Sequence, residues 1–448
     1  MTKVIQVTRV PKDTGPAAWN AILEAATPYP QLDGDITADW VIVGGGFTGL
    51  AAARRLSQIA SGDKIIVLEA CGLAEGPAGR NSGFMIDLPH DLNSETYAGA
   101  ADEDLKQIRL NRAAIDFTAQ LAKDFGMSQQ VFMGCGKVTG AASSRGEKHI
   151  QSYLQHIKAL QEDYRLLDGA EMKALTGIDF YTQGLYTPGA AMIQPAAFIR
   201  QAARGLSKTV SIYENSPVIE MQLGADHLLK TPKGKVRTKN IILAVNGHIQ
   251  SFGYFNKKLL HAFTYASMTR PLTPEEVERL GGEANWGVLP ADPMGTTVRR
   301  VSNLMGSGDR LTVRNHFTLN QSLEVSQAQI QSAAKSHDKA FRARFPMLDT
   351  VPMEYRWGGR LCLSLNSVPA FGELEERVYS AACQNGLGTV KGTLSGMMAA
   401  DLAANVDSAI LREYMAYDPP SRLPPEPFLS VGANATMRWK EWLAGSEL

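Results

Sequence analysis

The clearest pattern of apolar positions lies near residue 40, where a short apolar run leads through a glycine-rich turn into a helical pattern. Residues 40–43 are apolar and of strand length. In residues 49–59, Leu50, Ala53 and Leu56 recur at the spacing of one helix face. The pattern therefore predicts a buried strand, a tight turn and a helix in direct succession.

The turn has the spacing G-x-G-x-x-G, formed by Gly44, Gly46 and Gly49. In this spacing the first glycine allows the turn, the second lets a pyrophosphate approach the backbone, and the third lets the helix pack close to the sheet. A phosphate would lie at the positive end of the helix. The expected cofactor contacts of this turn are Val43, Gly44, Gly46, Phe47, Thr48 and Gly49.

A second apolar run, "KIIVLEA", follows the helix and ends in an acid. Glu69 stands twenty-three positions after Gly46, close to the separation of about 20 expected for the acid that binds an adenosine ribose. Strand, turn, helix, strand and acid occur in order, which predicts a Rossmann-like dinucleotide domain. The alternative, a glycine-rich loop of no particular function, is disfavoured by this context.

Later segments repeat these signals. Residues 209–247 alternate as strand, hairpin and buried strand, ending in Asn246 and Gly247. Residues 378–402 again give strand, glycine turn and helix, which offers a second helix N-terminus to an anionic group. "GSGDRL" at 306–311 lacks the third glycine and indicates a hairpin turn, so no second dinucleotide fingerprint exists.

These pieces lie far apart, so the nucleotide domain must be discontinuous. The predicted class is α/β, with a Rossmann-like domain and an α+β second lobe built on an antiparallel sheet. We expect the nucleotide domain to comprise residues 1–100, 200–254 and 351–448, and the substrate domain to comprise residues 101–199 and 255–350.

Composition excludes several function classes. The 448 residues are 44% hydrophobic and 20% charged, as in ordinary globular proteins. Lys+Arg and Asp+Glu both number 45, which leaves no basic field for nucleic acid or anionic lipid. No secretory core or membrane-length apolar run occurs, and the four cysteines have no metal-ligand spacing. We therefore expect a cytoplasmic protein without a metal site.

The glycine fingerprint, "GPAGRNSGF" at 76–84 and "RWGGRLCLSLNSVPAFG…ACQNGLGTVKGTLSG" near the C-terminus resemble the D-amino acid oxidase and glycine oxidase superfamily of FAD flavoproteins. Within it, the lead-in "WNAILEAATPYPQLDGDITAD" is most similar to gamma-glutamylputrescine oxidase-like amine oxidoreductases. The resemblance covers nearly the whole chain and is weakest over about 100–180 and 255–350. It implies that the pyrophosphate belongs to FAD.

The resemblance also implies site residues. Glu69 would bind the ribose, and Val218 would contact the adenine side through its backbone. Reduced flavin carries negative charge at its pyrimidine edge, where helix amides and the helix dipole stabilise it. The ring would be lined by Arg80, Asn81, Ser82, Gly83 and Phe84, its pyrimidine edge held by Gly386, Leu387, Gly388 and Thr389, and the cofactor contacts completed by Ala70, Asn246 and Gly247.

Two departures from the family pattern bear on the cofactor. Ala78 stands where relatives commonly have serine, which puts one polar contact in doubt. Some relatives attach FAD through a histidine, but the matching stretch here is Arg80-Asn81-Ser82, and Cys362 falls about three places late for a cysteine linkage. We therefore expect non-covalent FAD, with covalent attachment as the alternative.

Three residues are candidates for direct chemical roles, each with a structural alternative. Lys391 would stabilise superoxide or bind a substrate carboxylate, or else be a solvated helix lysine. Arg360 would pair with a carboxylate or form a structural ion pair, and Arg314 is the next candidate anchor. His90 would accept a proton or be a structural loop residue. Phe84 would wall the flavin or belong to the core.

The predicted reaction is oxidation of the C–N bond of an amine or amino acid. Hydride passes to flavin N5 and the resulting imine hydrolyses, with oxygen or another acceptor reoxidising the flavin. Two alternatives stay open: a dehydrogenase that passes electrons to a protein or quinone, and a largely structural flavin-binding subunit of a complex. The second lobe carries no motif, so a diamine derivative, an N-methyl amino acid, a cyclic imino acid and a sulfonated amine are all candidate substrates.

Overall fold

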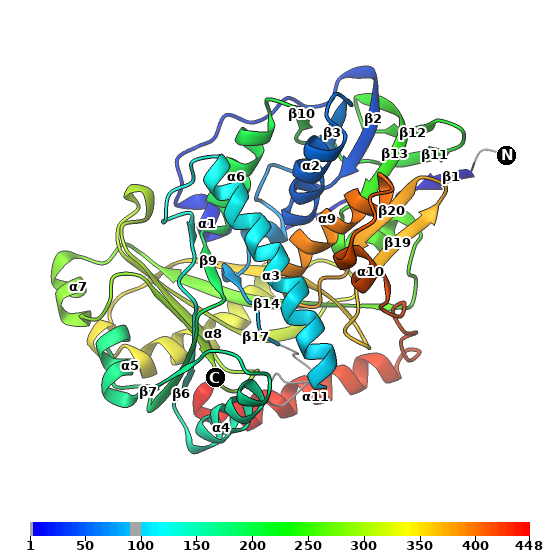
Figure 1. Cartoon of the computed structure of the whole chain (residues 1–448). Helices are drawn as coiled ribbons and strands as arrows, with labels where there is room; N and C mark the ends of the chain where they lie inside the picture. The colour runs from blue at the N-terminus through cyan, green and yellow to red at the C-terminus, as the bar shows by residue number, and fades with distance from the viewer. Residues whose placement is uncertain (1–2, 90–99) are drawn as a thin grey trace.

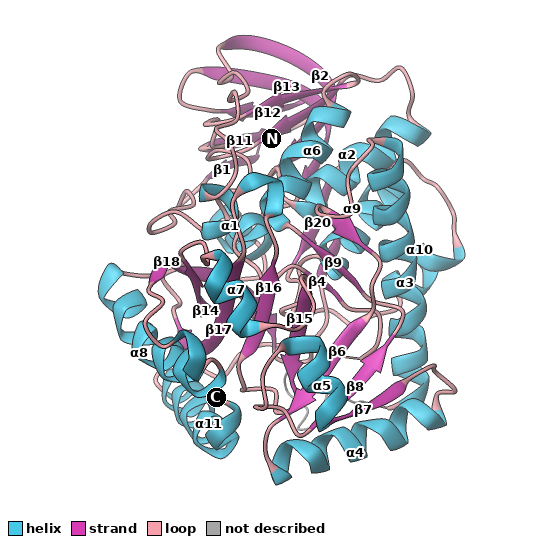
Figure 2. Cartoon of the chain, turned by 90° about the vertical axis from the view of Figure 1, so that its left-hand side faces the viewer, coloured by secondary structure: helices cyan, strands magenta, loops and turns pink. Residues whose placement is uncertain are grey.

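Two large β-sheets organise the chain, and helices pack on both (Figure 1). The structure is a computed structural model and describes residues 3–89 and 100–448. One sheet has nine strands, the other has eight, and a smaller sheet has three. Figure 2 shows the three-stranded sheet between the two larger ones. Its strands are β4 (Phe84–Met85), β5 (Phe132–Met133) and β9 (Ala191–Ile193).

The nine-stranded sheet has a parallel centre in which β20, β13, β2, β3 and β10 lie side by side. In β2, Trp40 and Ile42 join one hydrophobic cluster while Val41 and Val43 join another on the opposite face. Burial on both faces explains why this run is continuously apolar. The strands are β1 (Lys3–Gln6), β2 (Gly34–Val43), β3 (Ile65–Leu68), β10 (Val210–Tyr213), β11 (Glu220–Leu223), β12 (His227–Lys230), β13 (Gly234–Leu243), β19 (Ala370–Glu375) and β20 (Val378–Ala382).

Two helices begin at the carboxyl edge of this parallel centre. α2 (Phe47–Ile59) follows β2, and α9 (Val390–Ala403) follows β20. They pack so closely that a Cβ on Gly396 would lie 2.1 Å from the carbonyl oxygen of Thr48. Ligands of open α/β sheets bind at this edge. The neighbouring helices are α1 (Ala18–Ala21), α3 (Ala101–Asp124), α6 (Pro195–Leu206) and α10 (Ala409–Met415).

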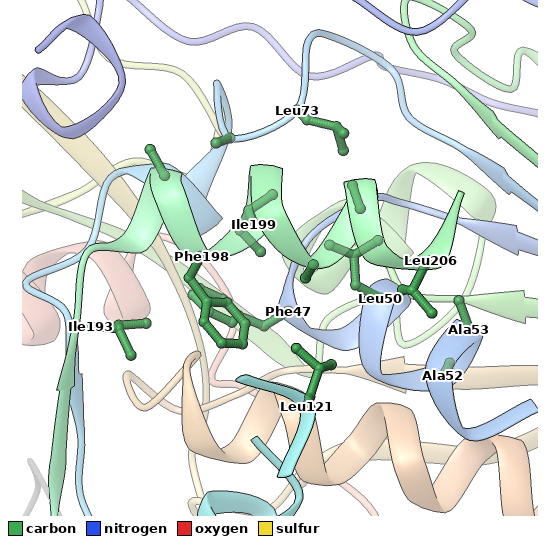
Figure 3. Close-up of a cluster of buried hydrophobic side chains, with 14 of the residues drawn as sticks. Phe47, Leu50, Ala52, Ala53, Leu73, Leu121, Ile193, Phe198, Ile199 and Leu206 are labelled. Atoms are coloured by element: carbon green, nitrogen blue, oxygen red, sulfur yellow. The ribbon is translucent and has the colours of Figure 1, made fainter. Parts of the chain in front are cut away.

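The first turn of α2 is fixed by packing against α6 (Figure 3). The rings of Phe47 and Phe198 stack with centroids 5.7 Å apart and an interplanar angle of 24°. Leu50 of α2 and Leu206 of α6 are buried in the same cluster. Burying each such side chain stabilises the fold by about 1.5–3 kcal/mol. The amides of the glycine turn are therefore held on a rigid support.

The eight-stranded sheet is antiparallel except where β15 pairs with β6. Its strands are β6 (Lys137–Ala141), β7 (Arg165–Asp168), β8 (Gln183–Thr187), β14 (Leu259–Thr269), β15 (Trp286–Pro290), β16 (Thr297–Val301), β17 (Arg310–Leu319) and β18 (Met353–Ser364). The remaining helices are α4 (Ser144–Ala159), α5 (Gly169–Thr176), α7 (Pro274–Leu280), α8 (Gln327–Arg344) and α11 (Phe428–Ala444). Short 3₁₀ helices are η1 (Pro77–Gly79), η2 (Asn246–Phe252), η3 (Leu304–Gly306), η4 (Pro346–Leu348) and η5 (Gly445–Glu447).

The predicted fold class is confirmed: the chain is mixed α/β, with a sheet whose parallel centre is buried on both faces and a second, mainly antiparallel sheet. The domain boundaries stay a prediction. Residues 351–448, which we assigned to the nucleotide domain, contain β18 and α11. In the structure β18 pairs with β14 over Leu259–Thr269, and α11 contacts β17, so both elements pack on the eight-stranded sheet. Within the described part of the chain, no helix combines the length and apolar character needed to cross a membrane.

Candidate active site

The three glycines of the turn differ in the space that surrounds them. Gly44 has φ +106°, and a Cβ there would lie 2.6 Å from the carbonyl oxygen of Ala244. A Cβ on Gly49 would lie 1.8 Å from the carbonyl oxygen of Gly44. Gly46 differs, because its φ is −86° and a Cβ would meet only the Cβ of Ala78, at 3.4 Å. The protein itself leaves room for a side chain at Gly46, and the approach of a pyrophosphate to this residue stays a prediction.

Glu69 is positioned at the end of β3, beside the turn. Its Oε2 accepts a hydrogen bond from the Gly45 amide at 2.7 Å, and its Oε1 accepts one from the Cys71 amide at 3.0 Å. Burial raises the pKa of Glu69, and the backbone donors oppose that shift. The carboxylate is thus held in place before any ligand binds.

A first cavity extends along this edge of the nine-stranded sheet. The predicted cofactor contacts that line it are Val43, Gly44, Gly46, Phe47, Thr48, Glu69, Ala70, Asn81, Val218, Asn246, Gly247, Gly386 and Gly388. Gly49 is not among its lining residues, because it packs against Gly44 beneath the turn. The structure therefore gathers segments more than 300 positions apart around one elongated space.

A second cavity adjoins the first, and both are lined by Asn81, Arg360, Gly386 and Gly388. One wall is the segment predicted to face a flavin, and it contributes Arg80, Ser82, Gly83, Phe84, Leu387 and Thr389. The opposite wall is the eight-stranded sheet, and it contributes Thr264, Ala266, Leu289, Thr297, Arg299, Thr312 and Arg314. This space therefore lies between the two large sheets.

The sheet wall follows from register. In the pairing of β16 with β17, Thr297 lies opposite Arg314 and Arg299 lies opposite Thr312. Alternate residues of a strand share a face, so all four side chains face the second cavity. Arg314 was predicted as a reserve anchor, whereas Arg299 was missed. The only available signal was the alternation in "TVRRV", which does not say which arginine points inward.

Residues 39–402 match the family described as FAD dependent oxidoreductase (DAO). The chain belongs to this family. It is 24% identical over 404 residues to "Probable oxidoreductase OrdL" of Haemophilus influenzae, covering 85% of this chain and 86% of that protein. It is 24% identical over 384 residues to "Gamma-glutamylputrescine oxidoreductase" of Escherichia coli, covering 84% and 85%.

Solved structures agree at the level of the fold. Glycine oxidase from Geobacillus kaustophilus superposes with a TM-score of 0.69 at 16% identity, covering 87% of this chain and 100% of that one. L-amino acid deaminase from Proteus myxofaciens gives 0.62 at 16% identity, covering 91% and 96%. Membership in the DAO family, the oxidoreductase class and the FAD cofactor are confirmed.

The residues of this DAO family chain fit FAD. Gly46 and Gly388 both line the first cavity, and a Cβ on Gly388 would have no atom within 4 Å. Both glycines stand at the start of a helix, where the helix dipole favours negative charge. Thr389 Oγ1 donates to the Phe84 carbonyl at 2.6 Å, which ties the start of α9 to residues 80–84, the segment predicted to face the flavin.

Hydrogen bonds of Arg80 and Asn81 hold residues 80–84 in place. Arg80 is buried, and its guanidinium donates to the carbonyl of Glu75 at 2.6 Å and to that of Gly15 at 2.5 Å. Asn81 Oδ1 accepts from the Gly83 amide at 2.8 Å. Burial lowers the pKa of Arg80, and Asp13 opposes that shift. The contact of Arg80 with the flavin stays a prediction, because its hydrogen bonds to the Glu75 and Gly15 carbonyls already use part of the guanidinium.

Arg360 forms a buried ion pair. Its Nη2 donates to Asp13 Oδ2 at 2.5 Å, and its Nη1 bonds to His248 Nε2. Desolvation and the Arg360 charge lower the pKa of His248 to about 3, so the ring accepts this bond in its neutral form. Of the two alternatives for Arg360, the structural ion pair is present, and its role toward a substrate stays a prediction.

The other two candidates for chemistry are Lys391 and His90. Lys391 lies in the first turn of α9, where its amide donates to the Leu387 carbonyl at 2.8 Å. It is not among the described residues that line either cavity. His90 lies outside the described residues. Both roles therefore stay predictions.

Proposed function

We propose that this protein oxidises the C–N bond of an amine or amino acid bound in the second cavity. The observation that carries the proposal is the arrangement of that cavity between the FAD-facing segments and the polar face of the eight-stranded sheet. A small molecule held there would lie against the ring, and placement of this kind supplies much of the catalysis in such reactions. Bound FAD supplies the acceptor for the hydride that leaves the carbon next to nitrogen.

The charges around the second cavity favour a neutral amine. Its described lining includes four arginines, Arg80, Arg299, Arg314 and Arg360, and no aspartate, glutamate or histidine. Positive charge disfavours an ammonium group and so lowers the pKa of a bound amine. The reacting nitrogen therefore has its lone pair available without a dedicated protein base, and water hydrolyses the imine product.

The same lining supports non-covalent attachment. The described residues around the second cavity include neither cysteine nor histidine. The first cavity, where the residues fit FAD, is lined by Cys71 and Cys362. Burial raises the pKa of Cys71, and Cys383 and burial raise that of Cys362, so the thiolate form that attachment needs is disfavoured at both.

The test is anaerobic mixing of the FAD-loaded protein with amines and amino acids in a stopped-flow spectrometer. Rapid loss of the oxidised flavin spectrum with at least one of them is the expected result. A flavin that keeps its oxidised spectrum with every compound, yet is reduced by dithionite, would contradict the proposal and favour a structural flavin.

A further inference from the structure

Residues 7–16 form an irregular segment beside the first cavity, which we call the strap. The strap follows β1 and precedes α1, and it contains neither helix nor strand. The match to the DAO family begins at residue 39, so the strap lies outside the matched part of the chain. The residues of the strap that line the first cavity are Val7, Arg9, Val10, Pro11 and Asp13.

The first half of the strap follows the nucleotide end of this cavity. The Val7 amide donates to the Ile219 carbonyl at 2.9 Å, and Ile219 directly follows the residue expected to contact the adenine. Farther along, the Pro11 carbonyl accepts from the Cys71 thiol at an S–O distance of 3.9 Å. The Cys71 amide in turn donates to Glu69, the acid expected to bind the ribose. The strap therefore passes from the adenine side to the ribose side of the expected FAD site.

The second half of the strap is held by a buried cluster of charges, which we call the latch. Asp13 Oδ2 accepts from Arg360 Nη2 at 2.5 Å, and Asp13 Oδ1 lies 3.9 Å from Arg80 Nε. These three side chains are between 3% and 7% exposed. Arg80 also donates to the carbonyls of Thr14 at 3.4 Å and Gly15 at 2.5 Å. Since Arg360 lines both cavities, the latch closes where the two cavities meet.

Further polar contacts join the strap to the loop between β17 and α8. The Lys12 ammonium lies 3.9 Å from Glu324 Oε2, and both side chains are exposed. Exposed ion pairs of this kind contribute little to stability. Two hydrogen bonds run to backbone carbonyls of the same loop, from Arg9 Nη1 to Ser322 at 2.7 Å and from Thr14 Oγ1 to Val325 at 2.5 Å. The strap therefore spans the first cavity from the nine-stranded sheet to the loop that follows β17.

The two ends of the strap are fixed more firmly than its middle. At one end β1 pairs with β11, and at the other Trp19 of α1 is 1% exposed and donates its indole N–H to the Asn81 carbonyl at 2.8 Å. Within the strap no apolar side chain is buried, and Val10 is 47% exposed. Segments with few buried apolar contacts open at a lower free energy than the whole fold. The strap can therefore lift from the cavity while both sheets stay folded.

We propose that the strap closes over bound FAD and that the latch holds it closed, so that FAD enters and leaves only when the strap lifts. The inference goes beyond the proposed function, because it concerns retention of the cofactor and involves no substrate. All partners in the latch belong to the chain itself, so the strength of the latch sets the fraction of molecules whose strap is open. A weaker latch therefore speeds both the release and the binding of FAD.

The first experiment measures the rate constants for release and binding of FAD. Release is followed by the rise of flavin fluorescence after dilution of the FAD-loaded protein, and binding by the quenching of that fluorescence after FAD is mixed with deflavinated protein. Asp13→Asn should raise the release rate constant at least about 10-fold, because breaking a buried ion pair costs more than the roughly 1.4 kcal/mol that corresponds to a factor of ten. The binding rate constant should rise as well.

A second acid that contacts the strap provides the matched control. Glu324→Gln removes only the exposed partner of Lys12 and should change either rate constant by less than about fivefold. An Asp13→Asn protein that releases FAD at the wild-type rate overturns the proposal. Release that becomes faster while binding becomes slower also overturns it, because Asp13 would then support the FAD site without keeping the strap closed.

A second experiment holds the strap closed without altering the latch. FAD-loaded Lys12→Cys/Glu324→Cys is treated with a bismaleimide whose linker contains a reducible disulfide. The joined protein should release FAD several-fold more slowly than the untreated protein, and reduction of the linker should restore the original rate. Treated wild type controls for the partly exposed Cys71 and Cys135. This result decides if Asp13→Asn fails to fold or to retain FAD, and release from the joined protein at the untreated rate overturns the proposal.

Discussion

Replacing Gly46 by valine tests where the pyrophosphate of FAD lies. The chain itself tolerates a side chain at this position, because φ is −86° and a Cβ would meet only the Cβ of Ala78, at 3.4 Å. Removing a glycine also restricts the unfolded chain, which stabilises a protein by about 0.4–1 kcal/mol where the backbone permits. The free energy of unfolding of the cofactor-free protein should therefore change by less than about 1 kcal/mol.

The cost should appear in cofactor binding instead. Forcing extra methyl groups into a filled space costs about 1–3 kcal/mol, and each 1.4 kcal/mol is a factor of about ten in affinity. Gly46→Ala should therefore raise the Kd for FAD by about 5- to 150-fold. Gly46→Val, with two further methyl groups against the same phosphates, should weaken binding at least as much.

The assay is titration of deflavinated protein with FAD, followed by quenching of flavin fluorescence, beside thermal unfolding of the same cofactor-free samples. Gly49→Ala is the matched control, because its Cβ would lie 1.8 Å from the carbonyl oxygen of Gly44. That variant should lower the Tm of the cofactor-free protein, whereas the Gly46 variants should not. A Gly46→Val protein that binds FAD with the wild-type Kd would refute the placement of the pyrophosphate.

Three further outcomes are expected. Arg360→Gln leaves the Asp13 side chain with Arg80 alone, whose Nε lies 3.9 Å from Asp13 Oδ1, and should lower the free energy of unfolding in urea by up to about 3–5 kcal/mol. Asp13→Asn/Arg360→Gln should recover part of that loss, and an unchanged single variant contradicts the ion-pair account. His337 is buried on α8, where its Nδ1 bonds to Ser267 Oγ at 2.7 Å, and burial lowers its pKa to about 4. The stability of wild type relative to His337→Gln should therefore be constant above about pH 6.5 and fall by about 2 kcal/mol by pH 5, where only the unfolded ring takes up a proton. A pH-independent difference in urea melts argues against this account. Acid precipitation should release all of the flavin as free FAD, and yellow colour remaining in the pellet would indicate a covalent link.

The sequence alone determined the nucleotide half of the site. The turn of Gly44, Gly46 and Gly49, the following helix and Glu69 all lie within about thirty residues of one another. Their roles depend on backbone conformation and local spacing, which neighbouring residues encode directly. In the structure, carbonyl oxygens leave no room for a Cβ at Gly44 and Gly49. The parallel centre was readable for the same reason, because strands buried on both faces must be continuously apolar.

Only the tertiary structure decided the second cavity. Arg360 pairs with Asp13 across 347 positions, and Arg299 reaches Ser82 across 217. Such contacts depend on how distant strands are aligned, and a slip of one residue would turn every side chain of a strand to the other face. Arg299 and Arg300 are adjacent and chemically identical, yet one faces the cavity and the other is paired with Asp309. The register of β16 against β17 makes that distinction, and no local pattern in the chain encodes it.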